Sequence, residues 1–343
     1  MGHCAYSIRR TRLLLPAGEG KMKMRIARLT PAWLAVIFGL VVLSTPPTAR
    51  ATFAGSNGRI AFSYGDQFPG GDLGSHTDIF AIRPNGSHLQ QLTHVPNEAA
   101  AALPSWSPDG TKIAFESNVS GNYEIWVMDA DGRHKVQITD EPRFEHLTPS
   151  WSPDGSQIAY SRCDTPFGFI GSCDINVMSA DGSYAYRVVG GHRIHGRPVF
   201  SPDGTSIAFA SDRAGFISAI WVVNADGTGL QRLTSPNTEG FWPDWSPDGE
   251  RILFTDNCCR PHSNLWSVSP DGMGLTRLTD STPGHNLMFG SYAPSGRKTV
   301  LTSDEAYPRF CCTDIVVRGA NGDLSTIVEG GRALVIASWG SAK

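Results

Sequence analysis

The amino-acid sequence predicts an all-β protein, a six-bladed β-propeller built from four-stranded antiparallel blades. Three observations support this prediction. The seven residues PSWSPDG at 104–110 return at 149–155, as PVFSPDG at 198–204, as PDWSPDG at 243–249 and, weakened, as GSYAPSG at 290–296. Further short apolar runs follow each copy, and the two ends of the chain hold complementary parts of one more repeat. Repeats of about 45 residues with four strands each are typical of β-propellers.

The tetrapeptide Ser107-Pro108-Asp109-Gly110 has the composition of a tight turn between two strands. Proline presets φ at the first corner, aspartate tolerates the second, and glycine supplies the left-handed residue that follows. The aromatic residue before each turn ends a short strand and offers a large apolar surface, so we interpret it as a core residue. These aromatic residues are Trp106, Trp151, Phe200, Trp245, Tyr292 and Trp339.

Each complete repeat contains four runs of β-branched and aromatic residues separated by turn residues. In the second repeat, PSWSPDG is followed by KIAFES, YEIWVMDADG and HKVQIT, and such runs predict strands. We therefore predict one propeller domain over residues 52–343, after a signal peptide at 1–51. The predicted blades are 56–93 together with 333–340, 104–139, 149–189, 198–234, 243–279 and 290–328.

The first and last repeats are incomplete in complementary ways. The N-terminal repeat has a reduced turn at Ser56-Asn57-Gly58 and three later strands, whereas VIASWG at 335–340 resembles a first strand with nothing after it. We infer that the segment from Ala333 to Trp339 is the innermost strand of the first blade. This pairing closes the ring and leaves no free sheet edge.

The repeated pattern PxWSPDGxxIAFxS, followed by IWVMDADG and LT, resembles the repeat of TolB-type six-bladed propellers, which is shared with propeller domains of prolyl-oligopeptidase relatives. The resemblance covers nearly all of the chain after residue 51. It implies the fold far more specifically than it implies a function. TolB itself has an N-terminal α/β domain and a short extension that contacts its partners. The sequence has no room for either between Ala51 and the first blade, so we expect this chain to lack them.

The first fifty-one residues have the layout of a secretory signal peptide. Basic residues between positions 21 and 28 precede the apolar run from Ala32 to Leu43, and Ala49 and Ala51 supply the small residues of a cleavage site. The apolar run is short for a bilayer span, so we expect no stable membrane insertion after cleavage. Six of the seven cysteines follow this segment, as expected for an oxidising compartment. We predict export to the periplasm or the extracellular space.

Removal of the signal peptide makes the chain strongly acidic. The whole chain has 29 basic and 32 acidic residues, and residues 1–51 hold 8 of the basic and one of the acidic residues. The remainder carries 21 basic and 31 acidic residues, a net charge of −10. Such a surface repels a phosphate backbone, which argues against nucleic-acid binding.

The regular turns and the long loops are expected on opposite faces of the propeller. In a four-stranded meander, the turns between strands one and two and between strands three and four share one face. These turns are uniformly short here, whereas the connections of the other face are long and irregular. Binding residues are often carried by variable loops on a rigid scaffold. We therefore predict the binding surface on the long-loop face and the adjoining channel mouth, with the residues His146, His195, Arg197, Phe241, Trp242, His285 and Phe289.

His146 and His195 each stand three residues before the proline that starts a blade, so we expect them at equivalent positions near the axis. Two such histidines could bind a divalent metal if a third ligand came from elsewhere, such as His192, His285 or Glu145. The alternative is that these histidines are simply solvated. No other cofactor is predicted.

Six cysteines lie in or beside the long loops of the predicted binding face. Cys163 and Cys173 bracket one loop and could form a bridge across its base, which would stabilise the fold by about 2–4 kcal/mol. The adjacent pairs Cys258-Cys259 and Cys311-Cys312 lie in corresponding loops of neighbouring blades. Cross-blade disulfides are the leading interpretation of these pairs, and vicinal disulfides or a four-thiolate metal site are the alternatives.

The sequence favours a binding protein over an enzyme. It contains no GxSxG elbow with a downstream α/β domain, no HExxH and no Gly-rich phosphate loop after a strand. We predict a non-enzymatic protein-binding or ligand-binding scaffold of the cell envelope, whose partner is an envelope or extracellular protein or a carbohydrate. The alternatives are a metal-assisted lyase or hydrolase that acts on oligosaccharides with channel-face histidines, and a purely structural envelope protein.

Deletion of residues 334–343 is expected to abolish cooperative unfolding, because it removes the strand that closes the ring. Thermal melting of the truncated and the intact protein measures this effect. An unchanged melting curve would contradict the closure.

Overall fold

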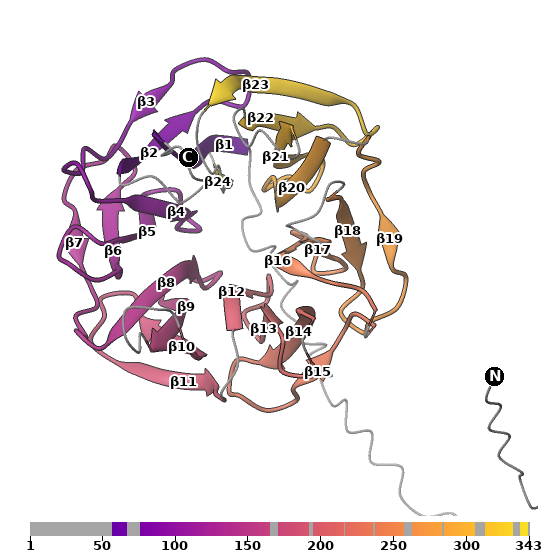
Figure 1. Cartoon of the computed structure of the whole chain (residues 1–343), viewed down its shortest axis with the longest axis horizontal. Helices are drawn as coiled ribbons and strands as arrows, with labels where there is room; N and C mark the ends of the chain where they lie inside the picture. Colours follow the sequence, from indigo (N-terminus) through magenta and orange to yellow (C-terminus); the bar gives the residue numbers. More distant parts are fainter. Residues whose placement is uncertain are drawn as a thin grey trace, which may run out of the picture. The chain divides into compact units, whose positions relative to one another are not determined.

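The structure, a computed structural model, describes residues 57–66, 76–164, 171–191, 195–215, 217–235, 237–256, 263–282, 285–305, 313–331 and 337–341. These residues belong to one compact unit, Thr45–Lys343, and residues 1–44 are not described. Strands β1 to β24 form six four-stranded antiparallel sheets arranged around an axis (Figure 1). The predicted fold class is therefore confirmed. Within the described ranges, no helix has the length and apolar character needed to cross a membrane.

In five blades the four strands follow each other in chain order, from the axis to the rim. The strands of blade 2 are β4 (Ala101–Trp106), β5 (Lys112–Ser117), β6 (Glu124–Asp129) and β7 (Val136–Gln137). The strands of blade 3 are β8 (Phe144–Trp151), β9 (Gln157–Asp164), β10 (Cys173–Ser179) and β11 (Ala185–Val189). The strands of blade 4 are β12 (His195–Phe200), β13 (Ser206–Ser211), β14 (Ala219–Asn224) and β15 (Gln231–Arg232).

The last two blades in sequence follow the same pattern. The strands of blade 5 are β16 (Phe241–Trp245), β17 (Ile252–Thr255), β18 (Leu265–Val268) and β19 (Thr276–Arg277). The strands of blade 6 are β20 (His285–Tyr292), β21 (Thr299–Glu305), β22 (Thr313–Arg318) and β23 (Leu324–Gly331). The innermost strands begin two to five residues before the predicted starts of these blades, so the repeated proline lies inside a strand.

Blade 1 joins the two ends of the propeller. Its sheet has the order β24 (Ala337–Ser341), β1 (Asn57–Asp66), β2 (His76–Ile82) and β3 (Gln90–Gln91). Strand β24 pairs antiparallel with β1, with Trp339 opposite Ile60 and Ala337 opposite Phe62. The predicted closure by a C-terminal strand is confirmed, although residues 333–336 of the predicted strand lie outside the described residues.

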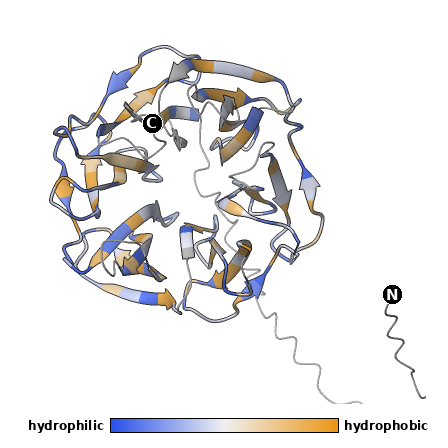
Figure 2. Cartoon of the chain, viewed as in Figure 1, coloured by the Kyte–Doolittle hydropathy of each residue, from blue (hydrophilic) through white to orange (hydrophobic). Residues whose placement is uncertain are grey.

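The core consists of apolar clusters between neighbouring blades (Figure 2). Trp151, for example, packs with Ile125 of blade 2 and Ile158 of blade 3. Its indole Nε1 also donates a hydrogen bond of 3.2 Å to the carbonyl oxygen of Ser105 in the preceding blade. The repeated aromatic residues are largely buried, and Trp339 is only 1% exposed. Their predicted role as core residues is confirmed.

The SPDG turns are stabilised by their own side chains. Gly110 has a φ of 67°, in the left-handed region that glycine adopts readily, and its N–H donates to Ser107 O at 2.9 Å. Asp109 accepts hydrogen bonds from the Ser107 hydroxyl and from the N–H of Thr111. These contacts explain why the same four residues recur.

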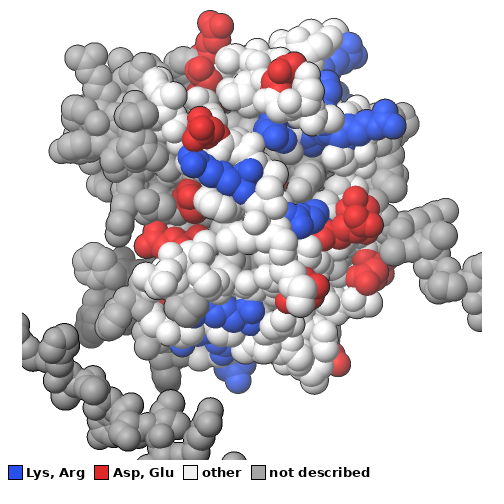
Figure 3. All heavy atoms as spheres, turned by 90° about the vertical axis from the view of Figure 1, so that its right-hand side faces the viewer, with Lys and Arg blue, Asp and Glu red and all other residues white. Residues whose placement is uncertain are grey.

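Acidic and basic side chains are interspersed on the side of the propeller that Figure 3 shows. The expectation that the protein does not bind nucleic acid stays a prediction.

Gly340 of the closing strand β24 lies close to Trp106 of blade 2. A Cβ atom at this position would lie 2.7 Å from Cδ2 of Trp106, which is itself buried. Gly340→Ala is therefore expected to lower the free energy of unfolding by about 1–3 kcal/mol, because the indole must move. Gly196→Ala is the control, since an added Cβ there has no neighbour within 4 Å. Urea unfolding of both variants checks this, and equal effects would contradict it.

Candidate functional site

A β-bulge interrupts the innermost strand of five blades at the same repeat position. In blade 2 the register between β4 and β5 shifts between Ala102 and Ser105, and the other four blades show equivalent shifts. The residue before the repeated proline or glycine has a positive φ in every one of these blades, although none is a glycine. These residues are Leu103 (51°), Thr148 (55°), Arg197 (46°), Trp242 (56°) and Phe289 (56°). Such a backbone conformation is strained for residues with a Cβ, and it is found most often at functional sites.

Hydrogen bonds from the preceding blade stabilise three of the bulges. The bonds join Leu103 N to Ser63 Oγ at 3.0 Å, Thr148 N to Glu116 Oε2 at 2.8 Å, and Phe289 N to Thr255 Oγ1 at 3.0 Å. The three acceptors lie on the second strands of their blades. The strained backbone is therefore stabilised by contacts between blades, which position its side chains relative to the axis.

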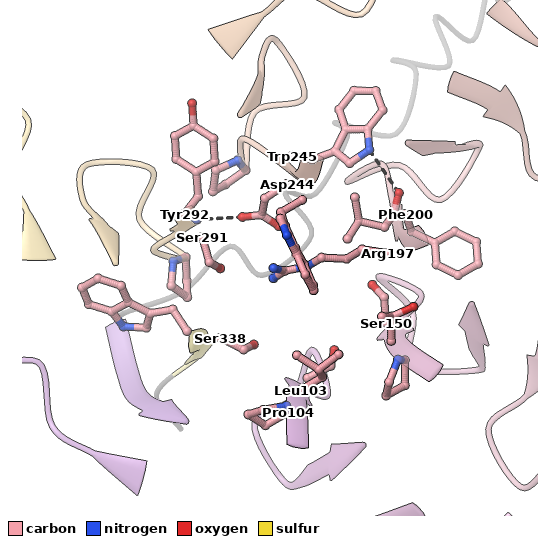
Figure 4. A pocket seen from close by; sticks show the side chains of 18 residues that line it. Leu103, Pro104, Ser150, Arg197, Phe200, Asp244, Trp245, Ser291, Tyr292 and Ser338 are labelled. Carbon is pink, nitrogen blue, oxygen red and sulfur yellow. Dashed lines mark hydrogen bonds between the residues drawn. The ribbon is translucent and has the colours of Figure 1, made fainter. Parts of the chain in front are cut away.

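The bulges surround a cavity of about 60 Å³ on the propeller axis (Figure 4). Innermost strands of all six blades contribute to its lining. The strained bulge residues that line it are Leu103, Thr148, Arg197 and Trp242. The residues two positions after the five bulges, together with Ser338 of blade 1, form a second ring of Ser105, Ser150, Val199, Asp244, Ser291 and Ser338.

Arg197 and Asp244 are the charged residues of the lining. Asp244 Oδ2 accepts a hydrogen bond of 2.7 Å from Tyr292 N, and the Ser291 hydroxyl also bonds to this carboxylate. Burial raises the pKa of Asp244 to about 6, although the nearby Arg197 cation acts in the opposite direction. Burial likewise lowers the pKa of Arg197, and Asp244 partly offsets this effect.

Arg197 and an aromatic cluster occupy the same wall of the cavity. The guanidinium carbon of Arg197 lies 5.2 Å from the ring centroid of Trp242, a cation–π distance. The Trp242 ring meets Phe289 edge to face at 5.1 Å, and Leu103 and Met288 pack against this pair. The site thus combines one cation, one carboxylate of raised pKa, several hydroxyl groups and an aromatic wall.

Comparisons with known proteins agree with this architecture. The family described as the TolB beta propeller domain matches residues 147–311. A TolB homolog of Chlorobium luteolum is 31% identical over 138 residues, which cover 40% of this chain and 29% of that protein. A TolB homolog of Protochlamydia amoebophila is 33% identical over 67 residues, which cover 19% of this chain and 14% of that protein. The propeller of this chain is therefore similar to the TolB beta propeller domain. The match spans less than a third of the length of either relative.

Solved structures share the fold of this TolB-like propeller. TolB from Acinetobacter baumannii superposes with a TM-score of 0.67 at 19% identity, covering 85% of this chain and 68% of that one. A putative TolB from Agrobacterium tumefaciens gives a TM-score of 0.60 at 21% identity, covering 83% of this chain and 99% of that one. At these identities the likeness concerns the fold alone.

The seven residues predicted for the binding surface of the TolB-like propeller are dispersed. Arg197 and Trp242 line the axial cavity, and Phe289 packs against Trp242. Phe241 and His285 begin β16 and β20 and are not among the lining residues. The last two, His146 and His195, also lie in innermost strands.

His146 lies inside β8 and is fully buried at the interface of blades 2 and 3. Its Nδ1 is 2.7 Å from Glu124 Oε2, and its Nε2 is 3.8 Å from Glu141 Oε1. The side chain of His195 lies outside the described part, so the metal site that pairs these two histidines stays a prediction. Within the described ranges, no group of three or more His, Cys, Asp or Glu residues is arranged to hold a metal ion.

Cys163 and Cys173 face each other in β9 and β10, at the base of the predicted loop. Their sulfur atoms are 2.04 Å apart, the distance of a disulfide. Cys258, Cys259, Cys311 and Cys312, the other predicted disulfide cysteines, lie outside the described residues.

The sequence interpretation missed the second ring of the cavity, which includes Asp244 and Ser338. It assigned the PSWSPDG repeats to packing and turns and predicted the binding surface on the long-loop face and the adjoining channel mouth. The cavity is lined by the repeats themselves, including the turn prolines Pro247 and Pro294, because the bulge brings repeat residues to the axis. Two signals were present: the variable residue before the repeated proline, and the aspartate that replaces serine in PDWSPDG.

Glu116, which accepts the hydrogen bond of the Thr148 bulge, makes the stability of the TolB-like propeller depend on pH. Burial raises the pKa of this carboxyl from 4.5 to about 7. Between pH 4.5 and about 7, Glu116 is therefore protonated in the folded protein and ionised in the unfolded chain. The free energy of unfolding falls as the pH rises through this range, and the loss is complete above about pH 7.

Glu116→Gln is expected to raise the free energy of unfolding by about 1–3 kcal/mol at about pH 8 and to change it little at about pH 4. The amide oxygen can still accept the hydrogen bond from Thr148 N. Urea unfolding of both proteins at the two pH values measures the difference. A variant that is equally stabilised, or destabilised, at both values would contradict this prediction.

Proposed function

We propose that this TolB-like propeller is an exported, non-enzymatic scaffold of the cell envelope that binds a protein or another ligand at its axial cavity and the adjoining long-loop face. The observation that carries the proposal is the ring of strained bulges. The packing residues of the repeats hardly vary, yet the bulge position holds leucine, threonine, arginine, tryptophan and phenylalanine. A rigid frame that directs four different bulge side chains into one cavity, with the fifth packed behind Trp242, has the arrangement of a binding site.

The chemistry of the cavity supports recognition. Binding sites combine apolar surface with a few positioned polar groups, and the cavity has an aromatic wall beside Arg197, Asp244 and several hydroxyl groups. Trp242 and Arg197 are of the residue types that contribute most of the binding energy in protein interfaces. Features of a signal peptide and the cysteine-rich loops support export, so the proposed partner is an envelope or extracellular protein or a carbohydrate.

Trp242→Ala is expected to abolish capture of the partner from the exported fraction, because loss of a central aromatic anchor typically weakens binding by 2 kcal/mol or more, roughly thirtyfold. Tyr184→Ala is the matched control, since Tyr184 is 66% exposed just before the rim strand β11. Affinity capture with the intact protein and both variants, each checked by thermal melting, measures this. Loss of capture with the control, or unchanged capture with Trp242→Ala, would contradict the proposed site.

A further inference from the structure

We propose that the axial cavity is a subsite for a carboxylate group, which Arg197 binds, and that the carbon chain bearing this carboxylate lies along the Trp242 wall. The inference rests on the proposed function, because it names the chemistry of the group held at the same site.

Among the described residues, no acidic group forms an ion pair with the Arg197 guanidinium. Its Nη1 atom is buried and has no hydrogen-bond partner among the described residues. A buried polar group without a partner is costly, and a buried cationic one more so. Figure 4 shows the side chain extending from β12 into the space between Asp244, Ser291 and Ser338. The guanidinium therefore points toward the ligand space.

Asp244 does not supply the missing partner. Its carboxylate is bonded to Tyr292 N and to the Ser291 hydroxyl of blade 6, and no ion pair joins it to Arg197 in the described part of the chain. The Arg197 cation thus influences Asp244 only over a longer distance. This arrangement leaves Arg197 available to a ligand.

The remaining lining fits a carboxylate better than a phosphate. Arg197 is the one cation of the lining, and Asp244 would repel a second negative charge. A carboxylate carries a single charge and is bound by a guanidinium through charge-assisted hydrogen bonds. The Ser150 and Ser338 hydroxyls are further donors in the same space, and Trp242 and Leu103 offer apolar surface for the attached carbon chain.

Two sources could supply this carboxylate: a free small carboxylic acid or a carboxylate of the bound partner. Phenylacetate is a suitable probe, because its ring suits the Trp242 wall, and phenylacetamide is its uncharged control. Calorimetric titration of the mature full-length protein is expected to show phenylacetate binding at least roughly tenfold tighter than phenylacetamide, the effect of one charge-assisted hydrogen bond. Arg197→Gln is expected to remove this preference.

Asp244→Asn tests the same subsite without removing its cation. Asp244 is faced by Arg197 from β12 and by the Tyr292 backbone of β20, and Arg251 and Asp248 lie near Tyr292. Protonation of Asp244 removes a repulsive charge, so the intact protein is expected to bind phenylacetate several-fold more tightly at about pH 5 than at about pH 8. Asp244→Asn is expected to bind at about pH 8 as tightly as the intact protein does at about pH 5.

Equal binding of phenylacetate and phenylacetamide, no binding of either, or unchanged preference in a folded Arg197→Gln variant would overturn the carboxylate subsite. If Arg197→Gln does not fold, unchanged phenylacetate affinity in Asp244→Asn at about pH 8 overturns it. Competition then separates the sources: if phenylacetate displaces the captured partner, the carboxylate belongs to the partner, and if capture continues, the ligand is a free acid. Partner capture that depends on Trp242 without any carboxylate preference refutes this inference and leaves the proposed function standing.

Discussion

The pairing of β24 with β1 is the contact on which the rest of the propeller depends. It joins segments from the two ends of the chain into one sheet, and it places Trp339 between blades 6 and 1. Gly340 lies directly against Trp106, so the closing strand also packs on blade 2. Only a closed ring holds six innermost strands at fixed positions around one axis, and the axial cavity exists because of that closure.

The innermost strands contribute both to the packing between blades and to the axial cavity. The aromatic residue of each repeat packs between blades, and four of the five bulge residues, together with the residues two positions after the bulges, line the axial cavity. A bulge changes which way consecutive side chains point, so a strand can serve both purposes within a few residues. Interblade hydrogen bonds such as Thr148 N to Glu116 Oε2 then hold the strained backbone in place.

Buried charge is distributed unevenly around the ring. Blades 2 and 3 enclose Glu116, Glu124 and His146, whereas blades 4 and 5 present Arg197 and Asp244 to the axis. His146 and Glu124 are bonded to each other and Glu116 to a bulge, so these groups belong to the interface of two blades. Arg197 Nη1, in contrast, has no hydrogen-bond partner in the described structure. The axial cavity, and not the buried His146–Glu124 pair, is therefore the candidate binding site.

The sequence by itself determined the fold, the number of blades and the closing strand, because turn geometry and repeat packing require the same residues at the same spacing. It also predicted that Arg197 and Trp242 belong to a binding surface, although on the long-loop face. Only the tertiary structure decided that Asp244 and Ser338, from distant parts of the chain, share one cavity with them. It also placed His146 in the core. The shared cavity and the buried position of His146 depend on the bulges and on ring closure. Both bring together residues that lie far apart in the sequence, and their spacing in the sequence does not predict these contacts.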